Sequence, residues 1–419
     1  MKISFNGKWK YQVDPLNAGM KESWWELTWI INQYAKLEEI NLPNNWNRLP
    51  ELKRYEGIVW FFYSFELKED QKNLESSELF LQFKAANYET HLWINGVDYG
   101  VHEGNFLPFR FRINSEAINY KESNYIAVRV ENLRKKDRIP TSSRDWFNYG
   151  GIYRDIDFLI LNKYRINWIG IKSNIHMRGS ATVNVHYEFK VPKKRINLSE
   201  SKNHEIKWNL YYLGDLSSQN QERRQKKVLL KSGSHLTSYK DRKDNFSIQL
   251  DEAQVWSPAN PRLYEIELTL TESEELYITR FGIREVIIKD SRLFLNRKSI
   301  SLQGVNLHEE LVPYGRSIPI EERRKDVITI KQMGFNALRT AHYPHDESIY
   351  DICDEEGLLV LEEIPVYWGI NFSSKKMLAL AARMLRTMIR RDFNHPSIIM
   401  WSAGNEIPIT ETACFQFMA

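Results

Sequence analysis

The chain has 419 residues and a net charge of only +4, which suits two or three domains and gives no reason to predict nucleic acid as a partner. Hydrophobic residues make up 42% and charged residues 27% of the sequence, a balance typical of globular rather than disordered or membrane-spanning chains. The densest basic run, Arg223 to Lys227, lies in a polar stretch and is interpreted as a solvated loop.

The cysteines and the N-terminus indicate the cellular compartment and the kinds of site to expect. Cys353 and Cys414 are too few for a disulfide framework, and neither has a partner at metal-ligand spacing. The N-terminus lacks the apolar core of a signal peptide, and no stretch of about 18 apolar residues occurs. The sequence therefore predicts a cytoplasmic protein with no membrane partner, no metal site and no cofactor.

Residues 1–165 follow a β pattern. Apolar and polar side chains alternate over residues 79–83 and 126–130. Asn95-Gly96, between two further strand-like stretches, is a strong signal for a tight hairpin turn. Many short strands separated by polar turns predict a jelly-roll sandwich for this segment.

Residues 166–285 continue in β. Every second side chain is apolar over residues 183–189 and 206–212. The length and the period of two predict a small immunoglobulin-like sandwich.

The pattern changes to alternating strands and helices over residues 286–419. Continuous apolar strands are typical of a parallel sheet covered on both faces. Strands are predicted at 300–305, 335–338, 358–361 and 397–401, with helices at 321–333, 346–356 and 377–389. A complete (β/α)₈ barrel needs roughly 250 residues, so we expect the N-terminal half of a TIM barrel.

Polar residues follow each predicted barrel strand. In such barrels, side chains just after the strands line the active site. These residues are Asn306 and His308 to Glu310 after the first strand, Arg339 and His342 after the second, Glu362 and Glu363 after the third, and Asn405 and Glu406 after the fourth.

Structural roles are the alternative for most of these residues. His308 alone fits a buried structural histidine, Arg339 a partner that neutralises a nearby carboxylate, and Glu362-Glu363 strand-end ion pairs. Asn405-Glu406 fits a structural role least well, because a carboxylate after an apolar strand gains nothing from packing.

Two segments carry a resemblance to a known family. Residues 336–344 and 392–406 are similar to two signatures of glycoside hydrolase family 2, the second being its acid/base signature. That family includes β-galactosidases, β-glucuronidases and β-mannosidases. Further family-like motifs occur in the right order at 55–60, 95–109, 148–155 and 280–284.

The resemblance implies a jelly-roll sugar-binding domain, an immunoglobulin-like domain and a (β/α)₈ catalytic barrel. It also implies roles for single residues. Glu406 matches the general acid/base, Asn405 the residue that binds the sugar 2-hydroxyl, His308, Arg339 and His342 the barrel-mouth residues around the glycone and nucleophile, and Asp145 the residue through which the first domain reaches the site.

A retaining glycosidase needs two carboxyl groups about 5–5.5 Å apart. Glu406 would be the proton donor, and burial or a nearby like charge would have to raise its pKa. In this family the nucleophile lies on a later strand than the four predicted here. We therefore expect little or no hydrolase activity from this chain alone, and open sheet edges that promote aggregation unless a C-terminal fragment completes the barrel or the chain forms a homo-oligomer.

Several interpretations of function stay open. The first is an exo-acting β-glycosidase, and the others are a non-catalytic carbohydrate-binding protein or an inactive remnant. The run from Trp146 to Ile152 is slightly more similar to β-glucuronidases, whereas Gly404 to Glu406 also occurs in β-galactosidases. The carbohydrate substrate is thus expected to be a β-glucuronide or a β-galactoside.

Overall fold

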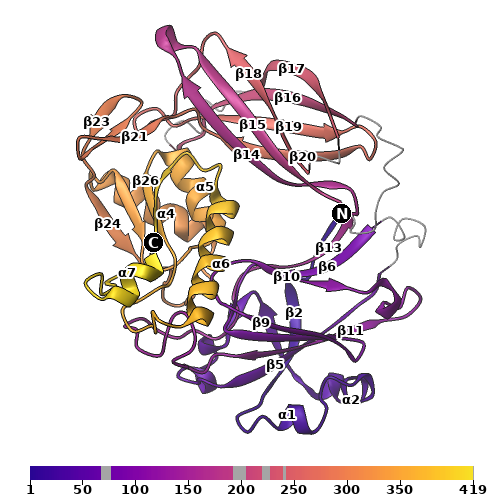
Figure 1. The fold of residues 1–419 in the computed structure, drawn as a ribbon. Helices are drawn as coiled ribbons and strands as arrows, with labels where there is room; N and C mark the ends of the chain where they lie inside the picture. Colours follow the sequence, from indigo (N-terminus) through magenta and orange to yellow (C-terminus); the bar gives the residue numbers. More distant parts are fainter. Residues whose placement is uncertain (68–76, 192–203, 219–226, 239–241, 419) are drawn as a thin grey trace.

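A computed structural model describes residues 1–67, 77–191, 204–218, 227–238 and 242–418. Figure 1 shows three units: a first sandwich (indigo to purple), a second sandwich (magenta to pink) and an α/β unit (orange to yellow) that lies beside both. Most of the basic run predicted as a loop, residues 223–226, lies outside the described residues. Among the helices of those segments, none combines the length and the apolar character needed to cross a membrane.

The first unit is a sandwich of antiparallel strands. One sheet has the order β1-β13-β6-β10, the second β3-β2-β5-β11-β8-β9, and a small third sheet β4-β12-β7. The strands are β1 (Lys2–Ser4), β2 (Gly7–Val13), β3 (Glu38–Leu42), β4 (Asn44–Asn45), β5 (Ile58–Phe65), β6 (Ser77–Phe83), β7 (Ala86–Asn87), β8 (Glu89–Ile94), β9 (Val97–Glu103), β10 (Phe109–Ile113), β11 (Asn124–Glu131), β12 (Gly151–Ile152) and β13 (Ile156–Asn162). The helices α1 (Ala18–Lys21) and α2 (Leu27–Gln33) and short 3₁₀ turns lie between strands.

The period-2 pattern has the predicted consequence. Leu79, Leu81 and Phe83 of β6 belong to one buried core that both main sheets share. The Asn95-Gly96 hairpin between β8 and β9 is confirmed, with φ of 51° and 79°, the left-handed values that a tight hairpin turn requires.

The second unit is a smaller sandwich. Its sheets have the orders β14-β15-β18 and β17-β16-β19-β20. The strands are β14 (Arg165–Ile175), β15 (Ala181–Lys190), β16 (His204–Asp215), β17 (Val228–Thr237), β18 (Lys243–Leu250), β19 (Arg262–Leu270) and β20 (Glu275–Phe281). Val183, Val185 and Tyr187 are buried whereas the residues between them are half-buried, which confirms the alternation seen in the sequence.

The third unit contains four parallel strands in the order β24-β25-β26-β27, preceded by a small antiparallel sheet β21-β22-β23. The elements are β21 (Val286–Lys289), β22 (Arg292–Leu295), β23 (Lys298–Ile300), β24 (Gly304–Leu307), α4 (Ile320–Gln332), β25 (Ala337–Thr340), α5 (Glu347–Glu356), β26 (Leu359–Glu363), α6 (Lys375–Asp392), β27 (Ile398–Ser402) and α7 (Thr412–Met418). Parallel strands joined by helices confirm the predicted partial TIM barrel.

The predicted start of the first barrel strand, residue 300, was wrong by four residues. Ile300 pairs with β22, and the parallel strand begins only at Gly304. Glycine is needed at position 304, because a Cβ there would lie 2.5 Å from the carbonyl oxygen of Ala337. One strand-like run, residues 300–305, thus spans two different sheets, which periodicity alone does not separate.

Capping residues set the bounds of α5. The side chain of Asp346 accepts a hydrogen bond from the backbone N–H of Ser348 at 3.0 Å, which satisfies a free donor of the first turn. Gly357 ends the helix with φ of 73°, where a Cβ would also meet the oxygen of Pro258 at 2.5 Å. The loop between β25 and α5 is therefore held firmly at its helical end.

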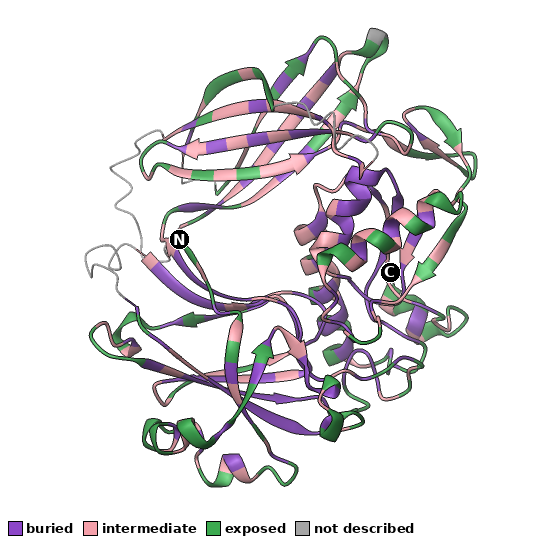
Figure 2. Ribbon diagram, turned by 180° about the vertical axis from the view of Figure 1, so that it is seen from behind, coloured by how far each residue is buried: buried purple, intermediate pink, exposed green. Residues whose placement is uncertain are grey.

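Among the described residues, β24 and β27 each pair with a neighbour on one side only. The open edges expected from the sequence are therefore present. Figure 2 shows that buried residues are concentrated in the strands of the first sandwich and in the interior of the α/β unit, whereas exposed residues lie on the outer surfaces. Self-association of the polypeptide through these edges stays a prediction.

A half-buried histidine gives the α/β unit a pH-dependent stability. Burial alone would lower the pKa of His395, but the Asp354 carboxylate, 2.6 Å from Nδ1, outweighs it and raises the pKa to about 9. Because the folded-state value exceeds the unfolded one of about 6.5, this contribution is complete below about pH 6.5 and is lost as the pH rises through about 9.

We predict that the free energy of unfolding falls between pH 6 and pH 9.5, by on the order of 3 kcal/mol from this group. Chemical denaturation at both pH values measures it. His395→Gln is the control: it lowers stability overall but removes this part of the pH slope. Equal slopes for the two proteins would refute the assignment.

Candidate active site

Glu363 is the centre of the polar cluster at the carboxyl end of the parallel sheet. It is the last residue of β26 and is fully buried. Its Oε2 accepts hydrogen bonds from Nη2 of Arg339 at 2.7 Å and from Oγ of Ser402 at 2.6 Å. Its Oε1 lies 2.8 Å from Nδ1 of His342. Three neighbouring strand ends therefore converge on one carboxylate.

These partners keep Glu363 ionised. Burial alone would raise its pKa, but the hydrogen bonds of His342, Ser402 and Arg339 outweigh it and lower the pKa below its usual range. The carboxylate is therefore a fixed negative charge that orients its neighbours.

Asn405 is oriented by the same arginine. Nη2 of Arg339 also donates to Oδ1 of Asn405 at 2.7 Å, and the backbone N–H of Asn405 donates to Val366 at 2.9 Å. The hydrogen bond to Oδ1 fixes the plane of the side-chain amide, and this also fixes the direction in which Nδ2 can donate. Asn405 is thus a preoriented hydrogen-bond donor.

Glu406 differs from its neighbours. It is exposed and has φ of 49°, a left-handed conformation that non-glycine residues adopt uncommonly and often at functional sites. Its charge acts on the phenol of Tyr367, whose pKa is raised by burial, by Asp145 and by Glu406. The described residues do not give Glu406 the burial that a general acid was expected to need.

The first sandwich contributes directly to this site. Asp145 accepts a hydrogen bond from the Tyr367 hydroxyl at 3.1 Å. The buried indole of Trp146 packs edge-on against Tyr367 at 5.2 Å between ring centroids, and lies 6.0 Å from His308 and 6.1 Å from His342. A loop of the jelly roll therefore forms one wall of the barrel mouth.

His308 completes the cluster from the end of β24. Its Nδ1 lies 3.2 Å from the hydroxyl of Tyr343. Burial, followed by the charges of His342 and Arg316, lowers its pKa. The imidazole is therefore neutral at neutral pH and offers one donor and one acceptor nitrogen.

Glu362, next to Glu363, faces away from the mouth. Alternation along β26 places the two side chains on opposite faces of the sheet. Glu362 accepts from the hydroxyl of Tyr350 at 2.7 Å and from Arg391 at 3.2 Å, and burial and the nearby Asp392 raise its pKa well above the usual range. Of the two glutamates predicted at this strand end, only Glu363 contributes to the site.

The structure thus brings Arg339, His342 and Asn405 together around Glu363. Asp145 and His308 lie beside this cluster: Asp145 accepts a hydrogen bond from Tyr367, and the ring of His308 lies near the indole of Trp146. Glu406 adjoins the cluster without a hydrogen-bond partner among the described residues. Arg339 and Glu363 do form the ion pair that the structural alternative predicted. That contact is compatible with a structural role and with a functional one.

Sequence reasoning missed Trp146, Tyr367 and Ser402 as site residues. Trp146 directly follows the predicted Asp145, so its position in the motif was an available signal. Tyr367 is in an apolar loop after β26 and has no such signal.

A jelly roll and a second sandwich precede a (β/α) barrel segment with carboxylates at its strand ends, an architecture that by itself does not define a reaction. Residues 3–162 match the sugar binding domain of glycosyl hydrolases family 2, residues 165–284 match a second domain of that family, and residues 286–418 match its TIM barrel domain. The chain belongs to glycoside hydrolase family 2.

Similar sequences are consistent with this family assignment. A β-galactosidase of Thermoanaerobacterium thermosulfurigenes is 29% identical over 95% of this chain and 53% of its own length. A putative β-glucuronidase of Formosa agariphila is 28% identical over 97% of this chain and 46% of its own length. The chain therefore spans about half the length of these relatives.

Solved structures show the same fold. A Ruminococcus gnavus β-glucuronidase in complex with D-glucuronic acid has a TM-score of 0.81 at 23% identity, over 100% of this chain and 69% of that one. A Bacteroides uniformis β-glucuronidase has a TM-score of 0.76 at 26% identity, over 97% of this chain and 47% of that one.

We predict that Glu363→Gln lowers the free energy of unfolding by about 3 kcal/mol, because a neutral amide cannot accept from three donors and leaves Arg339 unpaired. Ser402→Ala, which removes one of the three hydrogen bonds, is the matched control and is expected to cost about 1 kcal/mol. Denaturant unfolding at pH 7 compares the variants. A cost for Glu363→Gln no larger than for Ser402→Ala would contradict the central role of Glu363.

Proposed function

We propose that this chain is the acid/base-bearing part of a retaining exo-β-glycosidase of the β-glucuronidase/β-galactosidase type. The observation that supports it most is the cluster of Arg339, His342 and Asn405 around the Glu363 anion, with Glu406 directly after Asn405. Family membership supplies the reaction class, because the relatives are β-galactosidases and β-glucuronidases.

Each residue has a role that its chemistry suits. Glu406 protonates the glycosidic oxygen as the bond to the anomeric carbon breaks, and then removes a proton from the water that releases the sugar. Asn405, with its donor oriented by Arg339, binds the 2-hydroxyl. His308, His342 and Asp145 bind other hydroxyls of the glycone from three sides of the mouth.

The attacking carboxylate is not supplied by the described barrel strands. Glu363 is held by three hydrogen-bond partners, and Glu362 lies behind the sheet. Neither is free to form a bond to the anomeric carbon. We infer that further barrel strands, in the same polypeptide or in a complementing C-terminal fragment, pair with β24 and β27 and bring the nucleophile to Glu406.

Exposure of Glu406 agrees with this inference. A general acid that works near neutral pH needs its pKa raised by burial or by a second carboxylate. The missing nucleophile would provide that like charge, and the strands that carry it would bury Glu406. The substrate is a β-glucuronide or β-galactoside, and the cytoplasmic location expected from the sequence stays a prediction.

The first test is turnover. We predict that purified residues 1–419 hydrolyse neither an aryl β-glucuronide nor an aryl β-galactoside. Turnover that disappears in Glu406→Gln would support the acid/base role but refute the need for further strands. Turnover unchanged in Glu406→Gln would refute the acid/base assignment.

The second test is binding. Isothermal titration with methyl β-glucuronide and methyl β-galactoside should detect binding of one of them. Asn405→Ala should weaken that binding about tenfold, because one hydrogen bond is worth about 1 kcal/mol or somewhat more. Lys172→Ala, in the second sandwich, is a control that leaves affinity unchanged. Affinity that survives both Asn405→Ala and Asp145→Ala would instead favour a non-catalytic carbohydrate-binding protein that uses the jelly roll.

A further inference from the structure

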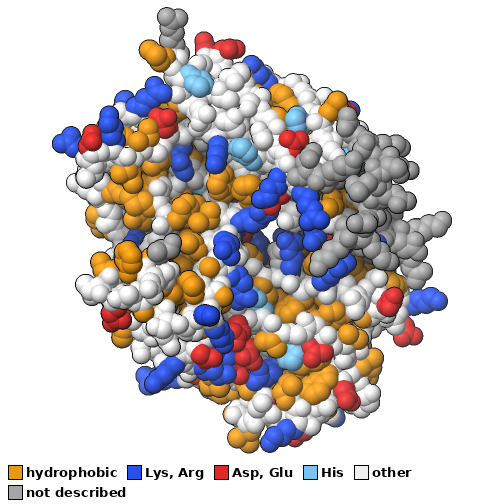
Figure 3. All heavy atoms as spheres, in the orientation of Figure 1, with side chains coloured by type: hydrophobic (Ala, Val, Ile, Leu, Met, Phe, Trp, Pro, Cys, Tyr) orange, Lys and Arg blue, Asp and Glu red, His pale blue; other side chains and the backbone are white. Residues whose placement is uncertain are grey.

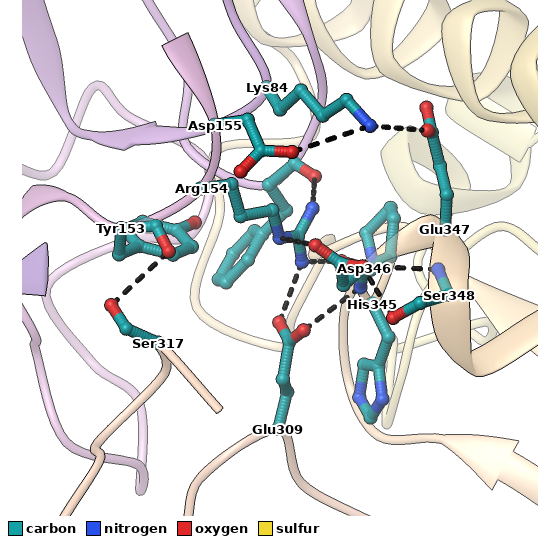
Figure 4. Close-up of polar contacts among 12 residues, drawn as sticks. Lys84, Tyr153, Arg154, Asp155, Glu309, Ser317, His345, Asp346, Glu347 and Ser348 are labelled. Carbon is teal, nitrogen blue, oxygen red and sulfur yellow. Dashed lines mark hydrogen bonds and ion pairs between the residues drawn. The ribbon is translucent and has the colours of Figure 1, made fainter. Parts of the chain in front are cut away.

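Arg154 of the jelly roll lies buried between the first sandwich and the α/β unit. It follows β12 and is 3% exposed. Its Nη2 donates to Oε2 of Glu309 at 2.6 Å and to the backbone oxygen of Pro344 at 3.1 Å, while Nη1 donates to the backbone oxygen of Phe106 at 2.6 Å. Figure 4 shows the guanidinium between the two units, with Glu309 and Asp346 directed toward it.

Both barrel contacts of Arg154 lie next to site residues. Glu309 directly follows His308, and Pro344 lies two residues after His342. Alternation along the chain explains the pairing: His308 faces the mouth whereas Glu309 faces the jelly roll. One guanidinium therefore holds the loops after β24 and after β25 at once.

Glu309 extends this connection into the helical side of the barrel segment. Its Oε1 accepts from the backbone N–H of Asp346 at 2.9 Å and lies 3.4 Å from Nη2 of Arg323. Asp346 in turn lies 3.6 Å from Nε of Arg154 and caps α5. The two loops cannot move independently without breaking buried charged hydrogen bonds.

The geometry requires arginine in particular. Three acceptors around Arg154 lie in the directions of a planar, five-donor fork, and a single ammonium group cannot reach all of them. Burial leaves no water to replace a lost partner. Without Arg154, Oε2 of Glu309 would lose its short charged hydrogen bond, and Arg323 at 3.4 Å from Oε1 would be the remaining cation.

We propose that Arg154 is a positioning residue for the barrel mouth, through which the jelly roll sets the relative placement of His308 and His342. The importance of Arg154 for catalysis rests on the proposed function. Its effect on the positions of the two histidines can be measured without any activity. The sugar-binding domain would then shape the site in two ways, by the wall of Asp145 and Trp146 and by the arginine behind the loops.

The same interface offers a matched control. Lys84 pairs across the same interface with Glu347 of α5 at 3.2 Å, and it lies 3.8 Å from Asp155 of its own unit. Its partners lie on α5 and on the jelly roll, not on the loops that carry the two histidines. Removing Lys84 therefore weakens the interface without releasing those loops.

The test uses residues 1–419 with ¹⁵N-labelled histidine, whose imidazole resonances report ring environment without any turnover. His308→Gln and His342→Gln assign the two signals among the 10 histidines of the chain. We expect Arg154→Gln and Arg154→Lys to shift both signals and Lys84→Gln to shift neither. Unmoved signals in Arg154→Gln, or equal shifts in Lys84→Gln, would overturn the proposal.

Two further measurements test the role of Arg154 if Arg154→Gln does not fold or if a glycoside binds. If Arg154→Gln fails to fold, Glu309→Gln keeps the shape of the partner and should shift the His308 signal, and an unmoved signal there would overturn the proposal. If a methyl glycoside binds the parent protein, Arg154→Lys should weaken that binding by up to about tenfold, because displaced histidines lose about one hydrogen bond to the sugar. Lys84→Gln should weaken it less than about twofold. Absence of glycoside binding by the parent protein would count against the proposed function alone, because the imidazole shifts still decide the role of Arg154.

Discussion

A buried negative charge at the end of β26 organises the whole barrel mouth. Glu363 is inaccessible to water, so its charge is tolerable only while His342, Ser402 and Arg339 surround it. Those partners come from the ends of β25 and β27 and the loop after β25, and Arg339 then orients Asn405. The need to pair one carboxylate therefore fixes the positions of the residues that would bind the sugar.

The second constraint lies behind the mouth. Arg154 connects the jelly roll to the loops after β24 and β25, and Trp146 fills the space between the rings of the same loops. Figure 3 shows a face on which Lys and Arg side chains gather near the middle, where the units adjoin. The jelly roll thus supplies one wall of the site, and its Arg154 is hydrogen-bonded to Glu309 and Pro344 in the loops behind that wall.

Glu406 differs from the other polar residues at this end of the sheet. It follows the oriented Asn405 and has a left-handed backbone conformation, but it is exposed and makes no hydrogen bond among the described residues. Under the proposed function, a nucleophile on a further strand would lie beside Glu406. Pairing of that strand with the sheet would change the exposure of Glu406 and the open edges of β24 and β27 together.

Local signals in the sequence were sufficient for the order of the elements. The hairpin at Asn95-Gly96 and the helix end at Gly357 depend on left-handed backbone conformations that only a few residue types favour. The start of α5 depends on the side chain of Asp346, which accepts a hydrogen bond from Ser348. Such local signals can be read from sequence. The start of the first barrel strand could not be predicted, because residues 300–305 form one strand-like run and only pairing with β22 or with β25 separates its two parts.

The sequence by itself determined that polar residues follow four parallel strands, and hence that His308, Arg339, His342 and Asn405 share one end of the sheet. Tertiary structure decided which of two adjacent glutamates faces that end, and that Arg154 and Trp146 reach it from the jelly roll. The reason is physical: period and turn chemistry act over a few residues, whereas the pairing of a buried charge depends on groups that lie more than a hundred residues away in the chain and meet only in the folded protein.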